Sequence, residues 1–294
     1  CVYMYHSPAH QEFEVRNPQP IDLCGRVWYR VQSRARRWTE RAVVRRAERT
    51  IVLSDFIGKL VEGYHGVIAD RIHVIPGGVD TDIFCPAPDR QAIRAALGLK
   101  EDEFVLFTLR NLEPRMGLES LIHAIAHARA NIPQLRLLIG GSGWLRPKLE
   151  AQVKTLGLEN CVQMLGFIPE ARLLDYYRAA DLFVLPTALL EGFGLVTIEA
   201  LASGTPVFGT RIGATEEILK TLDPALLSEG TDAGSLSAGI TALYRRFTSA
   251  PTMRARLAVE GRALVLRRYT WARHCEQVEG VLSEAIRYHS SSCQ

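Results

Sequence analysis

The sequence predicts an α/β protein with open, parallel, doubly wound sheets that carry helices on both faces. Apolar runs of strand length alternate with helical patterns, and most runs are too continuous in Val, Leu, Ile and Phe for a sheet with one face in water. The Pro-, Gly- and Asp-rich segment 76–90 divides the chain into two parts. A length of 294 residues fits two domains.

The elements follow from the period of the apolar residues. The predicted strands are 2–5, 50–53, 72–75, 104–109, 135–139, 162–165, 182–185, 206–209 and 225–227. The predicted helices between them include 118–130, 145–156, 171–180 and 195–203. Ligands of such sheets bind beyond the carboxyl ends of the strands.

Residues 1–75 hold only three predicted strands, which is an incomplete domain, whereas residues 96–266 supply a full α/β domain. The opening CVYMYHSPAH enters a strand directly and has no initiator Met. We therefore expect a fragment whose upstream part is missing. The tail from Tyr269 onward has the pattern of a final helix.

Composition excludes several classes of protein. Hydrophobic residues make up 47% and charged residues 23% of the chain, which is typical of a globular protein with a buried core. The net charge of +3 is too small to indicate nucleic-acid binding by itself. The six cysteines lack ligand spacing, which favours reduced thiols and a cytoplasmic protein. No apolar run is long enough to span a membrane.

The segment EGFGLVTIEALASGTPV, residues 191–207, follows a predicted buried strand and carries two acids. Gly192 and Gly194 allow a ligand to approach the backbone at a helix N-terminus, where free amides and the helix dipole favour phosphate. Glu191 and Glu199 flank that point at about 12 Å of helix length, which suits an extended diphosphate ligand with hydroxyls on either side. The alternative is that both acids are ordinary solvated residues.

This segment resembles the E-x7-E signature of retaining glycosyltransferases of the GT4 type (glycosyl transferases group 1), which have the GT-B fold of two Rossmann-like domains. HVIPGGVDTDIF, TLRNLEPRMGLESLIHA, LLIGGSGWLRPKLE, VQMLGFIPEARLLDYYRAADLFVLPT and YTWARHCE resemble further segments of the family, in order along the chain. The resemblance implies a partial, acceptor-side first domain with its linker over 1–83 and a nucleotide-sugar domain over 84–268. Residues 269–294 would form a helix that crosses back to the first domain.

The resemblance also implies roles for single residues. Glu199 would hold the ribose hydroxyls of the donor, and Glu191 would lie near the transferred sugar. The amides of Gly192, Phe193, Gly194 and Leu195 would face the sugar and the diphosphate. The turn Gly141, Ser142 and Gly143 would lie in the interdomain cleft, and Gly166, Phe167 and Ile168 would line the nucleobase pocket.

The diphosphate would be bound by arginines. Relatives usually place a Lys just before Gly117, where this chain has Met116. Arg110 and Arg115 remain nearby, and either can pair with phosphate in a bidentate manner. We favour Arg110 and hold Arg115 as a substitute for the missing Lys. No HExxH motif is present, and diphosphate binding by arginines and helix N-termini agrees with a metal-independent site without a cofactor.

His6 follows the first predicted strand, where a site in an α/β fold is expected. In the family a His at this place faces the donor sugar, so His6 is the candidate for contact with the sugar or the acceptor. A lone His is more often structural. His10 and Glu12 are weaker candidates.

Residues 26–49 contain nine Arg and two Glu. Apolar residues recur every three or four positions and predict an amphipathic basic helix: Val27, Val31, Ala35, Trp38 and Ala42. We favour the interpretation that this stripe packs on the core of the first domain. The alternative is peripheral contact with the anionic inner face of a membrane, if the acceptor is lipid-linked. Nucleic-acid binding is least favoured.

The sequence therefore predicts an enzyme that moves a sugar from a UDP-, GDP- or ADP-linked donor to a hydroxyl of a glycan, lipid or small molecule, with retention of anomeric configuration. Two alternatives stay open: an epimerase or hydrolase of the same fold, and a fragment that binds nucleotide sugar with little or no activity.

Overall fold

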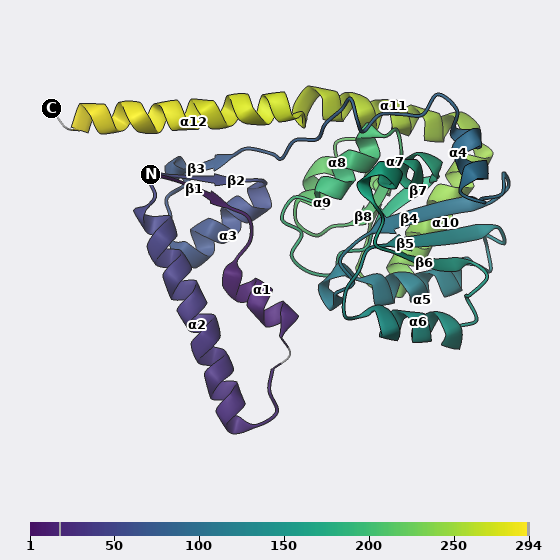
Figure 1. Ribbon diagram of the computed structural model, residues 1–294, viewed down its shortest axis with the longest axis horizontal. Coiled ribbons are helices and arrows are strands. Elements are labelled where there is room, and N and C mark those ends of the chain that lie inside the picture. The colour runs from purple at the N-terminus through teal and green to yellow at the C-terminus, as the bar shows by residue number, and fades with distance from the viewer. Residues whose placement is uncertain (18, 293–294) are drawn as a thin grey trace. The chain divides into compact units, whose positions relative to one another are not determined.

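The computed structural model describes residues 1–17 and 19–292, and Figure 1 shows their elements. The chain forms two compact units, of which the first joins residues 1–78 to 271–294 and the second is residues 79–270. No helix among the described residues is both long and apolar enough to cross a membrane.

The first unit is built on a small parallel sheet in the order β1-β2-β3. One face of the sheet packs against α2 and α3 through a cluster that includes Tyr5, Val44 and Val61. Val281 of α12 packs on the other face, against Ile51 and Ile75. The elements of this unit are β1 Val2–Tyr5, α1 Ala9–Arg16, α2 Leu23–Arg46, β2 Arg49–Val52, α3 Asp55–His65, β3 Ile72–Val74 and α12 Trp271–Ser292.

The second unit is built on a parallel six-stranded sheet in the order β6-β5-β4-β7-β8-β9. Its strands are β4 Phe104–Leu109, β5 Leu135–Gly140, β6 Val162–Gly166, β7 Leu182–Leu185, β8 Val207–Thr210 and β9 Leu227–Ser228. Its helices are α4 Arg90–Ala96, α5 Leu118–Ala128, α6 Arg146–Thr155, α7 Glu170–Ala179, α8 Leu195–Ala202, α9 Ala214–Leu219, α10 Ala233–Ser249 and α11 Pro251–Arg268.

This strand order contains a switch point. From β4 the chain winds to β5 and β6 on one side, and then returns to β7, β8 and β9 on the other. The helices α5, α6 and α10 pack together as one layer, and α7, α8 and α11 pack together as another (Figure 1). In open α/β sheets ligands bind beyond the carboxyl ends of the strands at such a switch point, which here lies between β4 and β7.

The predicted α/β class with parallel sheets is confirmed, and most predicted strands lie within a residue of the observed ones. The strand predicted at 225–227 was placed too early. A 3-10 turn occupies Pro224–Leu226, where the Asp223 side chain accepts a hydrogen bond from the Ala225 amide, and β9 begins only at Leu227. Proline has a fixed φ and no backbone N–H, so it cannot donate a hydrogen bond to a neighbouring strand.

The predicted packing of the Arg-rich helix was wrong. The predicted apolar stripe of α2 is largely exposed, with Trp38 at 73% and Val27 at 56%. The side chains that α2 buries are instead Tyr29, Ser33, Glu40 and Val44. Polar residues can face the interior here because they find partners, such as Glu14 for the Ser33 hydroxyl and His65 for Glu40.

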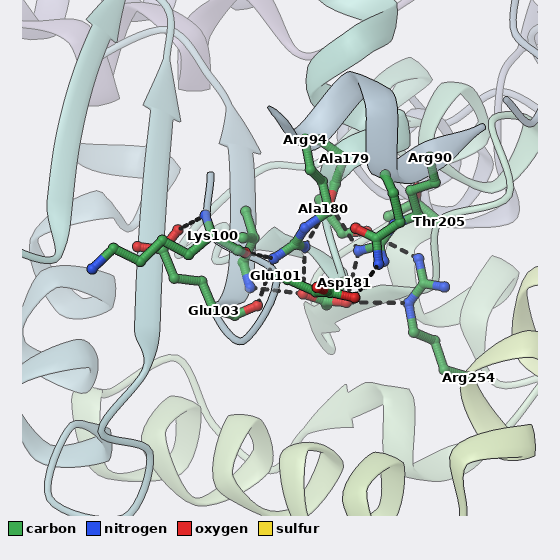
Figure 2. A network of polar contacts seen from close by, with 12 residues as sticks. Arg90, Arg94, Lys100, Glu101, Glu103, Ala179, Ala180, Asp181, Thr205 and Arg254 are labelled. Carbon is green, nitrogen blue, oxygen red and sulfur yellow. Dashed lines mark hydrogen bonds and ion pairs between the residues drawn. The ribbon is translucent and has the colours of Figure 1, made fainter. Parts of the chain in front are cut away.

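A network of arginines ties the amino-terminal edge of the second sheet together (Figure 2). The Asp181 carboxylate, just before β7, lies 2.7 Å from Arg90 Nη2, 3.1 Å from Arg94 Nη1 and 3.5 Å from Arg254 Nε. It also accepts a hydrogen bond from the amide of Val105 in β4. The network therefore joins α4, α11 and two central strands at the edge opposite to the switch-point loops.

Candidate active site

Loops from the carboxyl ends of the second sheet converge on Glu191. Its carboxylate Oε2 lies 2.5 Å from Arg110 Nη2, and Arg110 directly follows β4. The backbone oxygen of Glu191 accepts a hydrogen bond from the amide of Ala214, and a Cβ on Gly213 would lie 1.9 Å from that oxygen. The loops after β4, β7 and β8 thus meet at one acid, beside the switch point.

The Glu191 and Arg110 side chains form a buried ion pair, with exposed fractions of 9% and 6%. Thr187, which has no exposed surface, bridges the pair: its hydroxyl accepts from Arg110 and donates to Glu191 at 2.7 Å. Two opposite charges taken out of water are stable only with such additional hydrogen bonds. The pair is therefore held in one geometry before any ligand arrives.

Met116 completes the surroundings of Arg110. Its sulfur lies 2.8 Å from Arg110 Nη2, and the Met116 side chain is buried. Arg110 Nε is buried and has no hydrogen-bond partner among the described residues. A polar atom left in this way is a donor available for an acidic ligand.

Arg115 lies on the neighbouring 3-10 turn Pro114–Met116. Its Nη1 donates to the backbone oxygen of Leu190 at 3.0 Å, and its Nε lies 3.6 Å from Glu113 Oε2. Leu190 has a φ of +56°, in the left-handed region that non-glycine residues rarely adopt. The Arg115 contact thus supports a strained turn immediately before Glu191.

The N-terminus of α8 opens at the same place. Gly194 caps the helix in a left-handed conformation, with φ 75° and ψ 64°, and no side chain bonds to the first amides. A cap without a side-chain acceptor leaves helix amides free for an anion. Among the predicted residues here, Leu195 is exposed, whereas the Phe193 ring is buried against Tyr269. The Phe193 side chain therefore belongs to the core.

Glu199 lies one turn into α8 and is only partly exposed. Its Oε2 accepts a hydrogen bond from the hydroxyl of Tyr177 at 2.7 Å, and Tyr177 lies on α7. Burial raises the pKa of the Glu199 carboxyl, and the Tyr177 hydrogen bond only partly offsets this effect. The carboxylate is thus fixed in direction and lacks full solvation, which makes it a strong acceptor for a ligand hydroxyl.

The two remaining donor loops lie side by side. The amide of Gly141 donates to the oxygen of Gly166 at 2.8 Å, and the oxygen of Ser142 accepts from the amide of Leu112. Gly141 has a φ of +117°, and a Cβ there would lie 1.8 Å from the oxygen of Arg110. Glycine is therefore required where the β5 loop passes the β4 loop. Beyond them Ser142, Gly143 and Phe167 are exposed, and Ile168 is buried.

The structure thus brings the predicted residues Arg110, Arg115, Glu191, Gly192, Gly194 and Gly141 into connected loops of one unit. His6 belongs to the other unit, where it is exposed directly after β1. The weaker candidate His10 is buried beside Glu40, at 3.8 Å. Sequence reasoning missed Thr187 and Tyr177. Thr187 carried a signal, since it follows the end of a predicted strand, but Tyr177 lies within an ordinary helical pattern.

Comparison with known proteins identifies the family of the chain. The model of the family described as "Glycosyl transferases group 1" matches residues 89–262, which contain every predicted residue of the second unit. The chain belongs to this family. The model of "Glycosyltransferase Family 4" matches residues 1–83 of this chain.

Among curated relatives, D-inositol 3-phosphate glycosyltransferase of Geodermatophilus obscurus is 35% identical over 227 residues, which are 74% of this chain and 50% of that protein. The protein of the same name from Acidothermus cellulolyticus is 30% identical over 84% of this chain and 55% of its own length. The chain spans about half the length of the curated relatives it matches.

Solved structures confirm the GT-B fold. Sucrose-phosphate synthase of Thermosynechococcus elongatus matches 98% of this chain and 68% of its own, with a TM-score of 0.81 at 27% identity. The Anabaena protein HepE in complex with UDP-glucose matches 96% of this chain and 72% of its own, with a TM-score of 0.76 at 23% identity.

Proposed function

We propose that this chain binds a nucleotide diphosphate sugar at the carboxyl edge of the six-stranded sheet and transfers the sugar to an acceptor hydroxyl, with retention of anomeric configuration. The observation that carries the proposal is the buried Arg110–Glu191 pair beside the N-terminus of α8, at the switch point of the sheet. That arrangement offers a guanidinium, free amides and a fixed carboxylate within one group of loops.

The diphosphate is assigned to the positive groups. Free amides at the start of α8 and the helix dipole favour its oxygens, and the Nε of Arg110 supplies a further donor. Arg115 contributes charge from the adjacent turn in place of the Lys that relatives carry at Met116. These groups stabilise the negative charge that grows as the diphosphate leaves, which is the main catalytic effect.

The two acids are assigned to the hydroxyl groups of the donor. Glu199 accepts from the ribose, because its carboxylate is held in place by Tyr177 one turn below the start of α8. Glu191 precedes the start of α8 in the chain and is assigned to the hydroxyls of the transferred sugar. The turn 141–143 lies beside the donor, and residues 166–168 border the base. Contact of His6 with the sugar or acceptor stays a prediction.

In the reaction the bond between the anomeric carbon and the diphosphate oxygen breaks. A bond from the acceptor oxygen forms on the same face, and the hydroxyl proton leaves with the products. The products are the glycoside, the nucleoside diphosphate and one proton. We assign the electrostatic contacts of this step to the side chains named here, without a metal ion.

The acceptor is a hydroxyl of a glycan, a lipid or a small molecule. A reducing, cytoplasmic setting fits the cysteines, since Cys1, Cys24, Cys85, Cys161 and Cys275 are free thiols. Cys293 lies outside the described residues.

Calorimetric titration with UDP-, GDP- and ADP-sugars tests the proposal, and UDP-glucose, the ligand of the Anabaena structure, is the first of them. We expect one donor to bind, and Arg110→Gln to weaken its binding by roughly 1.5–3 kcal/mol, the range for hydrogen bonds to charged groups. The exposed Arg129→Gln is the matched control and should bind normally. Absence of binding by every donor, or equal binding by both variants, would refute the assigned site.

Transfer itself is measured separately, with the bound donor and a panel of acceptors. Release of nucleoside diphosphate together with a new glycoside supports the transferase. Release of free sugar or an epimerised donor without an acceptor would instead support the hydrolase or epimerase alternative. Donor binding without turnover would support the binding fragment.

A further inference from the structure

Helix α2 of the first unit has an unusual outer face. Its buried side chains, among them Tyr29 and Val44, lie on one side of the helix. At 100° per residue, Trp28 and Trp38 fall on the opposite side, where their side chains are 64% and 73% exposed. The helix therefore attaches to its unit by one face and presents an apolar stripe on the other.

The stripe is long and continuous. It begins with Ile21, just before the helix, and Leu23, the first residue of the helix, which are 90% and 77% exposed, and it ends near Trp38. The helical part from Leu23 to Trp38 covers about 22 Å at 1.5 Å per residue. Exposed apolar surface gathered in this way, with tryptophans in it, indicates an interaction site. The exposed members of the stripe within the helix are Leu23, Val27, Trp28, Val31 and Trp38.

A row of arginines runs beside this stripe. Arg30, Arg34, Arg37 and Arg41 follow one another at spacings of four, three and four residues, and all four are exposed. No ion pair joins Arg30, Arg34 or Arg41 to a carboxylate within residues 1–17 and 19–292. The carboxylate that α2 itself carries, Glu40, is buried. The exposed face of the helix therefore combines apolar and positive groups without a negative one.

We propose that α2 lies in the plane of a membrane surface that contains anionic lipids. The valines and tryptophans would enter the boundary between head groups and acyl chains, where indole rings are favoured. The arginines would pair with lipid phosphates, which guanidinium groups bind in a bidentate manner. None of the residues assigned to the donor site lies on α2, so this proposal does not depend on the transferase reaction.

Charge decides between three possible occupants from outside this chain. A second copy of the helix would bring the same arginine row against itself, and like charges repel. A nucleic acid would satisfy the arginines but leaves the aliphatic half of the stripe, such as Leu23 and Val27, without a partner. An anionic lipid surface offers acyl chains to the apolar stripe and phosphates to the arginines.

Co-flotation with vesicles tests the proposal. We expect the chain to bind vesicles of phosphatidylcholine mixed with phosphatidylglycerol, to bind pure phosphatidylcholine much more weakly, and to dissociate as salt is added. The triple variant Arg30→Gln, Arg34→Gln, Arg41→Gln should bind the anionic vesicles roughly 100-fold more weakly, because each arginine near such a surface contributes about a fivefold factor.

The apolar half is tested with Trp28→Ser combined with Trp38→Ser. We expect binding to fall about tenfold or more, and the blue shift of tryptophan fluorescence on vesicles to disappear. Trp144→Ser is the matched control, because Trp144 is 63% exposed in the other unit, and it should keep both signals. The exposed Arg267→Gln controls for charge.

Three results would overturn the proposal. Equal vesicle binding by all variants would remove α2 from the contact. A concentration-dependent dimer in sedimentation velocity, lost in the tryptophan variant, would assign the face to a second copy. Tighter binding to polyuridylate than to anionic vesicles would assign it to nucleic acid. Circular dichroism melts of the variants should match wild type, since each substituted side chain is exposed.

Discussion

At the scale of single residues, the candidate site contains buried ionisable side chains whose charged forms cost folding free energy when no ligand is bound. Glu199 is the clearest case, because burial raises its pKa and the pairing hydroxyl comes from a neutral tyrosine. An acid whose pKa is higher in the folded than in the unfolded state stabilises the fold fully below its ordinary value. That contribution is lost as the pH rises through the raised value, so ionised Glu199 opposes folding at neutral pH.

Glu199→Gln should therefore separate stability from binding. The free energy of unfolding at neutral pH should stay equal or rise, because the cost of the buried charge is removed, while nucleotide affinity falls by roughly 1.5–3 kcal/mol with the lost charged acceptor. Thermal denaturation and calorimetry measure the two quantities. The exposed Glu159→Gln should change neither. An unchanged affinity in Glu199→Gln would contradict the ribose role.

Thr187 shows how a fully buried residue can position charged ones. Its hydroxyl contacts both Arg110 and Glu191, and a valine of the same shape would leave each with one partner fewer. Thr187→Val should lower the free energy of unfolding by about 1–3 kcal/mol and weaken donor binding. Chemical denaturation and calorimetry measure these effects, and the exposed Thr155→Val is the control. Full donor affinity in Thr187→Val would show that the pair needs no bridge.

At the scale of elements, the site depends on loops that pass one another at backbone contact. Gly141 and Gly157 both have positive φ, at +117° and +64°, but only Gly141 has another backbone within reach of a Cβ. Gly157→Ala should cost about 1 kcal/mol for its conformation alone. Gly141→Ala should cost several-fold more and abolish donor binding, because the β4 and β5 loops must separate. Denaturant titration of both variants measures the loss in free energy of unfolding. Equal losses for Gly141→Ala and Gly157→Ala would refute the close approach of the β4 and β5 loops.

The arginine network at the other edge of the sheet ties several elements to one acid. Arg94 is 2% exposed, so removal of Asp181 would leave a guanidinium buried without its carboxylate. Asp181→Ala should lower the free energy of unfolding by about 3–5 kcal/mol, the usual cost of breaking a buried pair. The exposed Asp102→Ala is the control. A loss below 1 kcal/mol in chemical denaturation would show that the backbone oxygens around Arg94 suffice.

At the scale of the whole molecule, the two units should respond differently to acid. In the first unit burial lowers the pKa of His10 below its ordinary 6.5. Burial raises the pKa of Glu40, but the hydrogen bonds from His65 and the Ala9 amide outweigh it and leave that pKa below 4.5. Both groups stabilise the fold at higher pH. The His10 contribution is lost as the pH falls from 6.5 through the lowered pKa of His10, and that of Glu40 is lost as the pH falls from 4.5 through the lowered pKa of Glu40.

Acidification from pH 7.5 to 5 should therefore weaken the first unit, while Glu199 in the second unit contributes in the opposite sense. Hydrogen exchange of amides in β1–β3 and in β4–β9 measures the two units separately. His10→Gln should flatten the pH dependence of the first unit, and the exposed His123→Gln should not. Equal slopes in both units would contradict the assignment to His10.

The sequence by itself determined the fold class, the order of strands and helices, and the family. Period and continuity of apolar residues are local properties, and the segment 191–207 carries its signature within seventeen letters. The sequence also indicated the loop glycines of the site. Gly141 and Gly194 both have a positive φ, a conformation that favours glycine over other residues.

Only the tertiary structure decided which side chains meet and which helix face is covered. Arg110 and Glu191 are 81 positions apart, and no local pattern reports such a pair. The outer face of α2 was misjudged for the same reason. Helical spacing shows that an apolar stripe exists, but the Glu40–His65 and Ser33–Glu14 contacts determine that the opposite, more polar face turns inward. Partners distant in the chain set the orientation of each helix, and those partners are known only once the chain is folded.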